Sequence, residues 1–401
     1  MSLLPVAEAL ARVMDGAGPG SSEELPLHEA AGRVLAAPLR ALRTQPPFDA
    51  SAMDGYAVRS ADIAAAPARL RVIGEAPAGR LFSGMVGSGE AVRIFTGAPL
   101  PEGADTILIQ ENARKIEDGV IEALEPAKPG RHIRRRGLDF TEGEELLEAG
   151  RLLDPAALSL AASANHPSLS VVRRPRIAII ATGDELLPPG STTGPDQIIS
   201  SNAYGVGAVA KSIGAEAIDL GIAPDRRDAI AAMVRKALDS GVDVVVTLGG
   251  ASVGDHDLVH DVLAAEGMAL DFWRIAMRPG KPLMFGRLGA TRVLGLPGNP
   301  VASLICSHLF LKPLLARLGG LAHAPDIRDA ILGSELRAND VRQDYLRATV
   351  EDVGGRLVAT AFQVQDSSML RTLAASKALI VREPFAPAAE AGSPCKVLFL
   401  R

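Results

Sequence analysis

The sequence predicts a multidomain α/β plus β protein: a doubly wound, mostly parallel α/β domain, an inserted β-rich module, and a small C-terminal β-barrel or sandwich. From Arg176 to Leu318, apolar strands alternate with amphipathic helices, which is typical of a parallel sheet. On either side of that region, short apolar runs alternate with Gly and Pro turns, which indicates β-rich modules. The length of 401 residues allows two to four domains.

The N-terminal part of the chain combines two patterns. Residues 3–16 and 27–36 predict short helices, and the apolar runs from Thr44 to Ile133 predict a β-rich module. A strand–turn–helix pattern then returns, with Asp154 placed to cap a helix at 156–164. We therefore expect the β-rich module to interrupt the first domain. The predicted domains are a discontinuous N-terminal α/β domain (1–44 and 139–171), the inserted module (45–138), a second α/β domain (172–320) and a C-terminal β-barrel domain (321–401).

The second α/β domain contains four predicted pairs of a strand and a helix. Ligands of such sheets bind outside the carboxyl ends of the strands, so the loops that begin at Thr182, Leu248 and Leu296 form the expected site. After Gly320 the pattern is β-rich again, with one helix at 368–376. The predicted strands are 176–182, 216–222, 242–247, 291–296, 345–350, 357–364, 378–381 and 397–400, and the predicted helices of the α/β domain are 203–213, 227–239, 258–266 and 301–318.

Composition excludes several classes of function. The net charge of -5 gives no basic field for nucleic acid, and 3% aromatic residues are too few for base-stacking platforms. Cys306 and Cys395 lack a CxxC spacing, which argues against a metal or redox motif. Two cysteines in 401 residues suit a reducing cytosol. The uncharged stretch 155–172 contains Ser, Asn, His and Pro and is a poor membrane span. We therefore expect a cytoplasmic protein that binds neither nucleic acid nor membranes.

Two glycine-containing loops follow neighbouring predicted strands. Thr182 and Gly183 can offer a hydroxyl and a backbone amide to a phosphate, and Glu185 can hold Mg²⁺ or move a proton. By itself this motif is better interpreted as a strand-end turn with solvated acids. The second loop, 247–257, adds further amides and hydroxyls at a helix start. Its candidates are Gly249, Gly250, Ser252 and Asp257, and the two loops together are a much stronger indication than either alone.

Four other segments carry candidate residues. The turn 274–282 places Arg274, Arg278 and Lys281 around a Pro-Gly pair, where they could bind a dianion. In GLPGNP (295–300) Pro297 and Pro300 make a rigid strand–helix junction, and Asn299 could cap the helix. As an isolated run, 274–282 is more often a solvated surface turn, and GLPGNP can be simply a stiff junction; composition alone would also call 46–57, which contains Asp54, and 95–102, which contains Thr96, surface loops.

The motifs together resemble the molybdopterin molybdenumtransferase family, which includes the C-terminal part of gephyrin. PPFDASAMDGYAVR, FTGAPLPEGAD, GRHIRRRGLDF, ATGDEL, GGASVGDHD, RPGKP and GLPGNP occur in the family's order, and the resemblance spans essentially the whole chain. It implies a four-domain homodimer with an active cleft between the α/β domain of one protomer and the inserted module of the other.

The resemblance also implies roles for individual residues. The functional acids of the family match Asp54, Asp139, Glu185, Asp225 and Asp257, and Thr96, Lys281, Pro297 and Pro300 match its other motif residues. Arg274 and Arg278 stand where many relatives have Lys, so a planar fork replaces a point charge. The expected catalytic residues are Asp54, Glu185, Asp225, Asp257 and Lys281, with Mg²⁺ held by a subset of the four acids.

The expected reaction is insertion of molybdate into adenylylated molybdopterin with release of AMP. The upstream adenylyltransferase and molybdoenzyme apoproteins are implied as further partners. Two alternatives stay open. One is a nucleotide-using enzyme that adenylylates the pterin or cleaves a pyrophosphate, and the other is a non-enzymatic scaffold, a role that gephyrin also has. The inserted module counts against the first, and the complete set of acids counts against the second.

Overall fold

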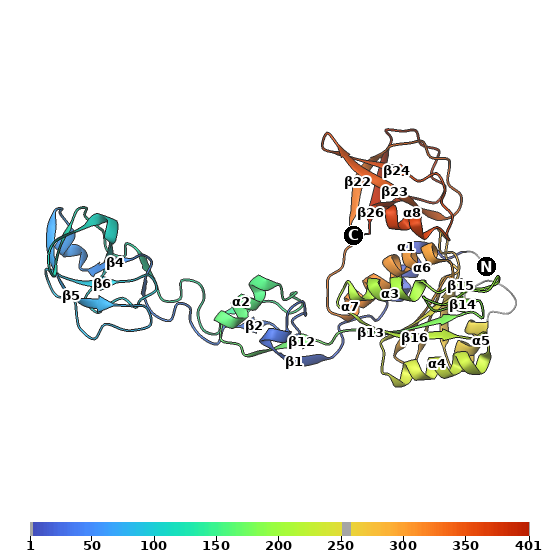
Figure 1. Cartoon of the computed structure of the whole chain (residues 1–401), viewed down its shortest axis with the longest axis horizontal. Coiled ribbons are helices and arrows are strands. Elements are labelled where there is room, and N and C mark those ends of the chain that lie inside the picture. The colour runs from blue at the N-terminus through green and yellow to red at the C-terminus, as the bar shows by residue number, and fades with distance from the viewer. Residues whose placement is uncertain (1–2, 251–257, 401) are drawn as a thin grey trace. The chain divides into compact units, whose positions relative to one another are not determined.

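The computed structural model describes residues 3–250 and 258–400. The chain divides into two compact units. The first comprises Met1–Glu23, Gly32–Ala36 and Val171–Arg401, and the second comprises Glu24–Ala31 and Ala37–Ser170 (Figure 1). Ser252 and Asp257, two of the predicted site residues, lie outside the described residues.

The first unit is built on a six-stranded sheet in the order β16-β13-β17-β21-β20-β18. The first four strands in this order run parallel, as predicted. Two antiparallel strands that the sequence analysis missed complete one edge of this sheet. The strands are β13 (Arg176–Thr182), β16 (Glu216–Ala223), β17 (Val244–Leu248), β18 (Ala269–Trp273), β20 (Met284–Leu288) and β21 (Thr291–Leu296).

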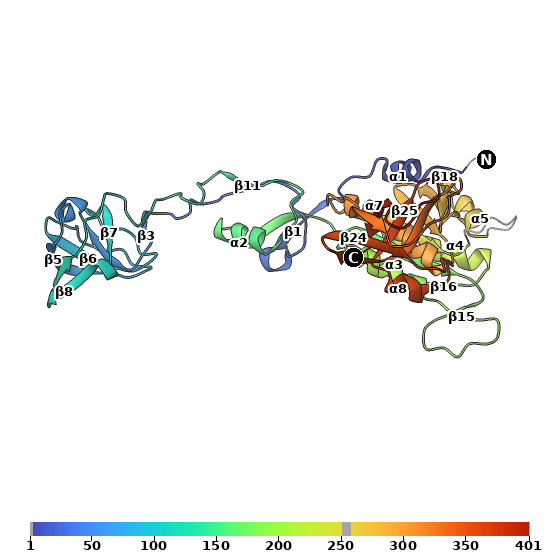
Figure 2. The ribbon, with the colours of Figure 1, turned by 90° about the horizontal axis from the view of Figure 1, so that it is seen from above.

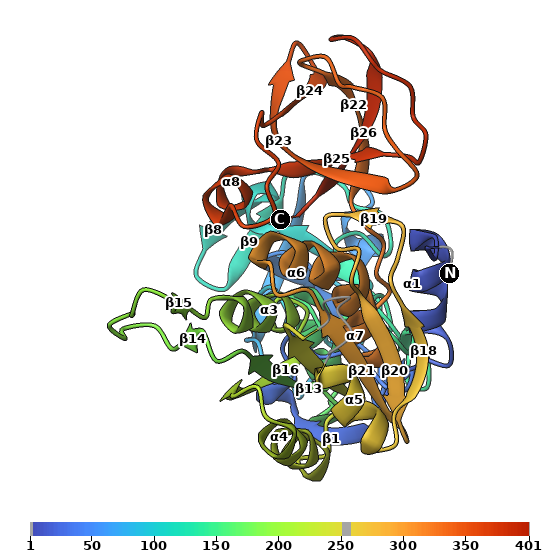
Figure 3. The same cartoon turned by 90° about the vertical axis from the view of Figure 1, so that its right-hand side faces the viewer.

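Helices cover both faces of this sheet, which makes it doubly wound (Figure 3). Alternation along β17 explains the two layers: Val244 and Val246 face one core and Val245 the other. The first core is covered by α1 (Val6–Met14), α3 (Asn202–Lys211), α6 (Pro300–Cys306) and α7 (Lys312–Leu318), and the second by α4 (Arg227–Asp239) and α5 (Leu258–Ala265).

The predicted helix at 301–318 is one continuous helical element. A π-helical segment, Ser307–Leu311, joins α6 to α7. By length and composition Pro300–Leu318 could cross a membrane, but 67% of it is buried inside the protein, where it packs under the sheet. Pro300–Leu318 is therefore a core helix of this unit.

The C-terminal part of the first unit is a closed five-stranded barrel, which decides between the two predicted alternatives. The strands follow the order β23-β24-β22-β26-β25, and a further pairing of β25 with β23 closes the ring (Figure 3). The short strand β19 (Met277–Arg278) pairs with the start of β23. The elements are β22 (Ile327–Leu332), β23 (Gln343–Val353), β24 (Arg356–Ala361), α8 (Leu370–Ala375), β25 (Ala378–Arg382) and β26 (Pro394–Phe399).

A long loop, 188–197, separates two short strands beyond β13. β14 (Leu186–Leu187) and β15 (Ile198–Ile199) pair in parallel, and the loop between them extends away from the sheet (Figure 2). The pairing sets Ile198 and Ile199 opposite Leu186 and Leu187, which follow β13, and both isoleucine side chains are exposed.

The second unit contains the inserted β-rich module as a six-stranded sheet in the order β7-β4-β6-β5-β9-β8. Its strands are β4 (Gly55–Val58), β5 (Ala68–Ala76), β6 (Glu90–Ile94), β7 (Thr106–Ile109), β8 (Ala113–Glu117) and β9 (Val120–Ala123), with short helical turns η2 (Ser60–Ile63) and η3 (Gln110–Asn112). The flanking elements are β1 (Ser22–Pro26), β2 (Leu39–Arg40), β3 (Ala50–Ser51), β10 (Ile133–Arg134), β11 (Glu145–Leu147), α2 (Pro155–Ser163) and β12 (Ser168–Val172).

One predicted helix of this region is confirmed and another is wrong. The Asp154 side chain accepts a hydrogen bond of 2.9 Å from the Ala157 amide and caps α2, as predicted. The helix predicted at 27–36 is only a single turn, η1 (Leu27–Glu29). Gly32 adopts φ +70, a left-handed conformation that a continuing helix cannot include.

Candidate functional site: the cavity at the carboxyl edge of the α/β sheet

A cavity of about 930 Å³ lies at the carboxyl ends of β13, β17 and β21. This is the edge at which ligands of parallel sheets bind. The loops after Thr182, Leu248 and Leu296, which the alternation of strands and helices indicated, all contribute to its wall. The predicted site residues that the fold brings together here are Thr182, Gly183, Glu185, Asp225, Gly249, Gly250, Pro297 and Pro300.

The two glycine-containing loops meet around Thr182. A side chain on Gly249 would lie 3.0 Å from the Thr182 carbonyl oxygen, and one on Gly250 would collide with Val259 on α5. Both glycines also have positive φ, of +90 and +64. Only glycine combines this conformation with so close an approach, so the loop after β17 can lie against the end of β13 with its backbone open to a ligand.

Three carboxylates gather where β13 and β16 end. The amide of Asp225 donates a 3.0 Å hydrogen bond to Asp184 Oδ1, and the Glu185 carboxylate lies over Gly183. Partial burial raises the pKa of Asp225, the charges of Asp184 and Glu185 raise it further, and a backbone hydrogen bond from Asp184 opposes the shift. Glu185 and Asp225 also line the cavity, whereas none of the described Lys and Arg residues does.

This donor set fits Mg²⁺ bound together with a phosphate. Within 3–250 and 258–400, no group of three or more His, Cys, Asp or Glu side chains is arranged around a metal position. Mg²⁺ in phosphate-handling sites typically uses one or two protein carboxylates, substrate phosphates and water. Glu185 and Asp225, both lining the cavity, meet that requirement.

The GLPGNP loop is held by side chains from two other segments. Asn299 does not cap α6 with its side chain, contrary to the prediction; its Nδ2 donates instead to Ser367 Oγ at 2.9 Å. The Val301 amide donates to the Ser367 carbonyl at 3.0 Å, and Asn202 Nδ2 donates to the Gly298 carbonyl at 2.7 Å. Pro300 occupies the first turn of α6, where its missing N–H is tolerated.

The barrel contributes cavity residues that sequence reasoning missed. These barrel-domain residues are Ser368 and Leu370. Asn202, at the start of α3 in the α/β domain, also lines the cavity. The segment that carries Ser368 is held by Arg347, which is 1% exposed and donates to the Asp366 carbonyl at 2.8 Å. In the sequence, 365–369 looks like an ordinary turn before a helix, and no local signal relates it to the strands of the α/β domain.

None of the three cations of the turn 274–282 lines the cavity, although the neighbouring Pro282 does. The Arg278 guanidinium pairs with Asp344, which is 4% exposed, and lies 3.6 Å from Asp340. Arg274 has φ +94 and lies 5.9 Å from the centre of the Trp273 ring. Lys281 is exposed and forms no ion pair with any residue of the described ranges.

Two further predicted acids, Asp54 and Asp139, belong to the second unit. Asp54 Oδ1 accepts two hydrogen bonds of 2.8 Å from Thr96, one from its amide and one from its hydroxyl. These two bonds, the amide first, lower the pKa of Asp54, and the charge of Arg93 adds to the effect. Asp139 is exposed, and its amide donates to the Gln45 carbonyl at 3.0 Å.

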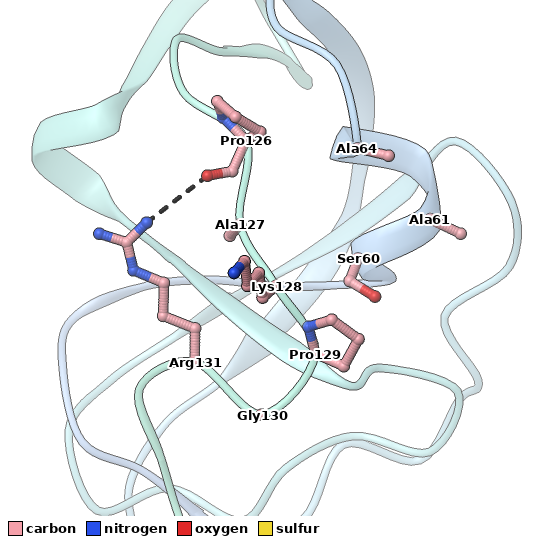
Figure 4. A pocket seen from close by; sticks show the side chains of 9 residues that line it. All are labelled: Ser60, Ala61, Ala64, Pro126, Ala127, Lys128, Pro129, Gly130 and Arg131. Carbon is pink, nitrogen blue, oxygen red and sulfur yellow. Dashed lines mark hydrogen bonds between the residues drawn. The ribbon is translucent and has the colours of Figure 1, made fainter.

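The inserted module has a hollow of its own, of about 900 Å³, which contains none of the predicted site residues (Figure 4). Its wall runs from Ser60 to Ala64 and from Pro126 to Arg131. Its polar groups are already partly engaged. The Ser60 hydroxyl donates to Asp105 at 2.8 Å, and Arg131 reaches the Pro126 carbonyl at 3.5 Å.

Family models match three consecutive parts of the chain. The MoeA N-terminal region (domain I and II) matches residues 4–165, and a probable molybdopterin binding domain matches residues 178–317. The MoeA C-terminal region (domain IV) matches residues 329–400. The cavity loops after β13, β17 and β21 all fall inside the second match.

Relatives match over most of their length. A molybdopterin molybdenumtransferase of Nostoc sp. is 38% identical over 343 residues, which cover 83% of this chain and 78% of that protein. One of Haemophilus influenzae is 37% identical, with 91% and 90% covered. The crystal structure of a molybdopterin biosynthesis MoeA protein from Pyrococcus horikoshii superposes with a TM-score of 0.86 at 29% identity, covering both chains fully. The chain therefore belongs to the molybdopterin molybdenumtransferase family.

Proposed function

We propose that the protein inserts molybdate into the dithiolene of adenylylated molybdopterin and releases AMP. One observation carries this proposal. The cavity at the carboxyl edge joins two glycine-containing loops, two acids and the rigid GLPGNP loop within the part of the chain that matches a molybdopterin binding domain. Open backbone amides and hydroxyls suit the substrate phosphates.

In this mechanism the loops after Thr182 and Leu248 hold the substrate phosphates. Gly183, Gly249 and Gly250 let the backbone approach them, and Ser252 adds a hydroxyl. Glu185 and Asp225, with Asp54 and Asp257 as further candidates, would hold Mg²⁺. When bound, Mg²⁺ withdraws electron density from the phosphoanhydride. The raised pKa of Asp225 supports this assignment, because burial and, to a lesser extent, the charges of Asp184 and Glu185 disfavour its ionised form, and a bound cation would favour that form.

We propose that molybdate lies near the cationic turn and the GLPGNP loop. Lys281 is the principal cation in this proposal, because it has no acidic partner in the described part of the chain. Arg274 is a second candidate. Arg278 contributes less as an anion ligand, because Asp344 and Asp340 already neutralise much of its charge. Pro297 and Pro300 keep the loop rigid, and cleavage of the adenylate accompanies transfer of molybdenum to the two dithiolene sulfurs.

We further propose a cytoplasmic homodimer of four-domain subunits with the boundaries predicted above. Asp54 and Thr96 of the inserted module, together with Asp139 at the point where the N-terminal domain resumes, would act on substrate bound by the partner subunit, as the family resemblance implies. Sedimentation at micromolar concentration tests the assembly, and a species with only the monomer mass would contradict it. The upstream adenylyltransferase and molybdoenzyme apoproteins are the expected protein partners.

The direct test is mass analysis of the product after the protein is mixed with adenylylated pterin, Mg²⁺ and molybdate. Formation of the molybdenum-loaded pterin together with AMP is the expected result. Formation of the adenylate from ATP and free pterin would instead identify an adenylyltransferase. Failure to restore nitrate reductase activity in a cofactor-deficient host, together with no product in vitro, would favour a scaffold.

A further inference from the structure

We infer that Arg93 is a positioning residue for Asp54, so that insertion depends on this arginine. The inference rests on the proposed function, in which Asp54 acts on the bound substrate. Arg93 lies on β6, and its neighbour β4 begins directly after Asp54 (Figure 1). No motif in the sequence singles Arg93 out.

The position of the Asp54 carboxylate is set from one side only. Both hydrogen bonds from Thr96 end on Oδ1. Oδ2 has no hydrogen-bond partner in the described part of the chain and is the oxygen left for a ligand. Its direction therefore depends on how the backbone at Asp54 is held relative to Thr96, which follows β6.

Arg93 connects the segments that hold this backbone. Its guanidinium donates to the Gly55 carbonyl at 3.1 Å and to Gln110 Oε1 at 2.8 Å. The Gln110 amide in turn donates to the Asp54 carbonyl at 3.1 Å. One side chain on β6 thus joins the start of β4 to the turn after β7, and both partners are bonded to Asp54 or adjacent to it.

Two aromatic rings keep the guanidinium in place. Its carbon lies 5.2 Å from the centre of the Tyr56 ring and 5.0 Å from that of Phe95. Tyr56 stands opposite Arg93 in the β4–β6 register, and Phe95 precedes Thr96. The backbone beneath is tightly confined, because a side chain on Gly55 would collide with the Leu108 carbonyl. Stacking and two directed donors at once require the planar fork of arginine, which lysine lacks.

The simpler alternative is an arginine that only stabilises the module. A double-mutant cycle separates the two roles, because residues that act through one another are not additive. The variants are Arg93→Met, Asp54→Asn and the double variant, assayed for insertion with saturating and limiting substrate and for thermal midpoint. Arg71→Met is the matched control, because Arg71 lies in the same sheet and pairs with Glu90, away from Asp54.

We expect Arg93→Met to lower kcat by about ten- to a hundredfold, as loss of a supporting contact does at other sites, with little change in KM. In the Asp54→Asn background the same substitution should cost less than about threefold. Arg71→Met should keep parental activity. If Arg93→Met melts early, Arg93→Lys replaces it, and this variant should also be slow because the charge alone cannot hold both partners.

Two outcomes would overturn the inference, and they differ in what they imply. If Asp54→Asn slows insertion but Arg93→Met does not, or if the two effects are additive, Arg93 does not act through Asp54 and the proposed function stands. If Asp54→Asn retains full activity, the role proposed for Asp54 fails, and the inference about Arg93 fails with it.

Discussion

Asn299 in the GLPGNP loop donates a 2.9 Å hydrogen bond to the hydroxyl of Ser367, which belongs to the segment leading into α8 of the barrel domain. Asn299 and the adjoining Ser368 both line the cavity. This contact therefore joins the strand–helix turn of the α/β domain to the C-terminal domain at the wall of the cavity.

Asn299→Ala should disturb the site more than the fold. Losing one partly exposed hydrogen bond costs about 1 kcal/mol of unfolding free energy, whereas a displaced loop wall lowers the insertion rate by about tenfold or more. The measurement is insertion rate beside the urea midpoint. Ser159→Ala on the exposed face of α2, which removes a hydroxyl bonded to the Pro155 carbonyl, is the control and should change neither. A fall in the urea midpoint large enough to account for the lost insertion rate would show that the contact is only structural.

Glu185→Gln should keep the fold and slow insertion by about a hundredfold. Glu185 lines the cavity at the end of a buried strand, and removal of a group that binds the metal or moves a proton typically has an effect of this size. Glu216→Gln is a matched control, because Glu216 begins the neighbouring strand at the opposite edge of the sheet. Single-turnover rates measure the effect. Unchanged turnover in Glu185→Gln would remove this residue from the site.

Lys281→Ala should weaken the binding of molybdate or of the substrate phosphate by about ten- to a hundredfold, the usual consequence of losing one charge-assisted contact. Its thermal midpoint should stay close to that of the parent, because an exposed lysine contributes at most about 0.5 kcal/mol to stability. The dependence of the insertion rate on molybdate concentration and the affinity for substrate are the readouts. Parental values for both ligands would assign Lys281 to an ordinary solvated turn.

Arg278→Met should lower the stability of the protein while changing the binding of molybdate less than Lys281→Ala does. Asp344 is buried and loses its cationic partner, and its Oδ1 already lacks a hydrogen bond within the described residues. Leaving a buried charged group unpaired costs more than the roughly 1–3 kcal/mol of a neutral one, so urea unfolding should shift clearly. Adding Asp344→Asn should restore much of the loss. A molybdate dependence that changes as much as in Lys281→Ala would return Arg278 to the anion site.

Asp225→Asn should raise the thermal midpoint of the free protein slightly while slowing insertion. The pKa of Asp225 is raised in the fold by burial and by neighbouring carboxylates, so its ionised form is less favourable there than in the unfolded chain. Its contribution to stability is therefore present at low pH and is lost as pH rises through its unfolded and then its folded pKa. When thermal midpoints are measured in EDTA from pH 3 to 7, the midpoint of the parent should decrease relative to that of Asp225→Asn as the pH rises. A parent that gains on the variant over that interval would contradict the shift.

Local patterns in the sequence were enough for elements whose residues interact mainly with their neighbours. The bounds predicted for β21 and α4 are those observed, because apolar strands and amphipathic helices repeat with short periods. The antiparallel strands β18 and β20 were missed because neither shows a clear alternation of apolar and polar residues. The helix expected at 27–36 failed at a glycine whose conformation depends on the surrounding fold.

The sequence by itself determined the fold class, the family and the strand ends at which a candidate site is expected, because apolar periodicity and turn chemistry are local properties. Only the tertiary structure decided which side chains meet there. Asn299 forms a hydrogen bond with Ser367, which is 68 positions away in the sequence, and Arg278 pairs with Asp344, which is 66 positions away. Contacts between segments so distant along the chain form only when the domains pack, and no local periodicity encodes them.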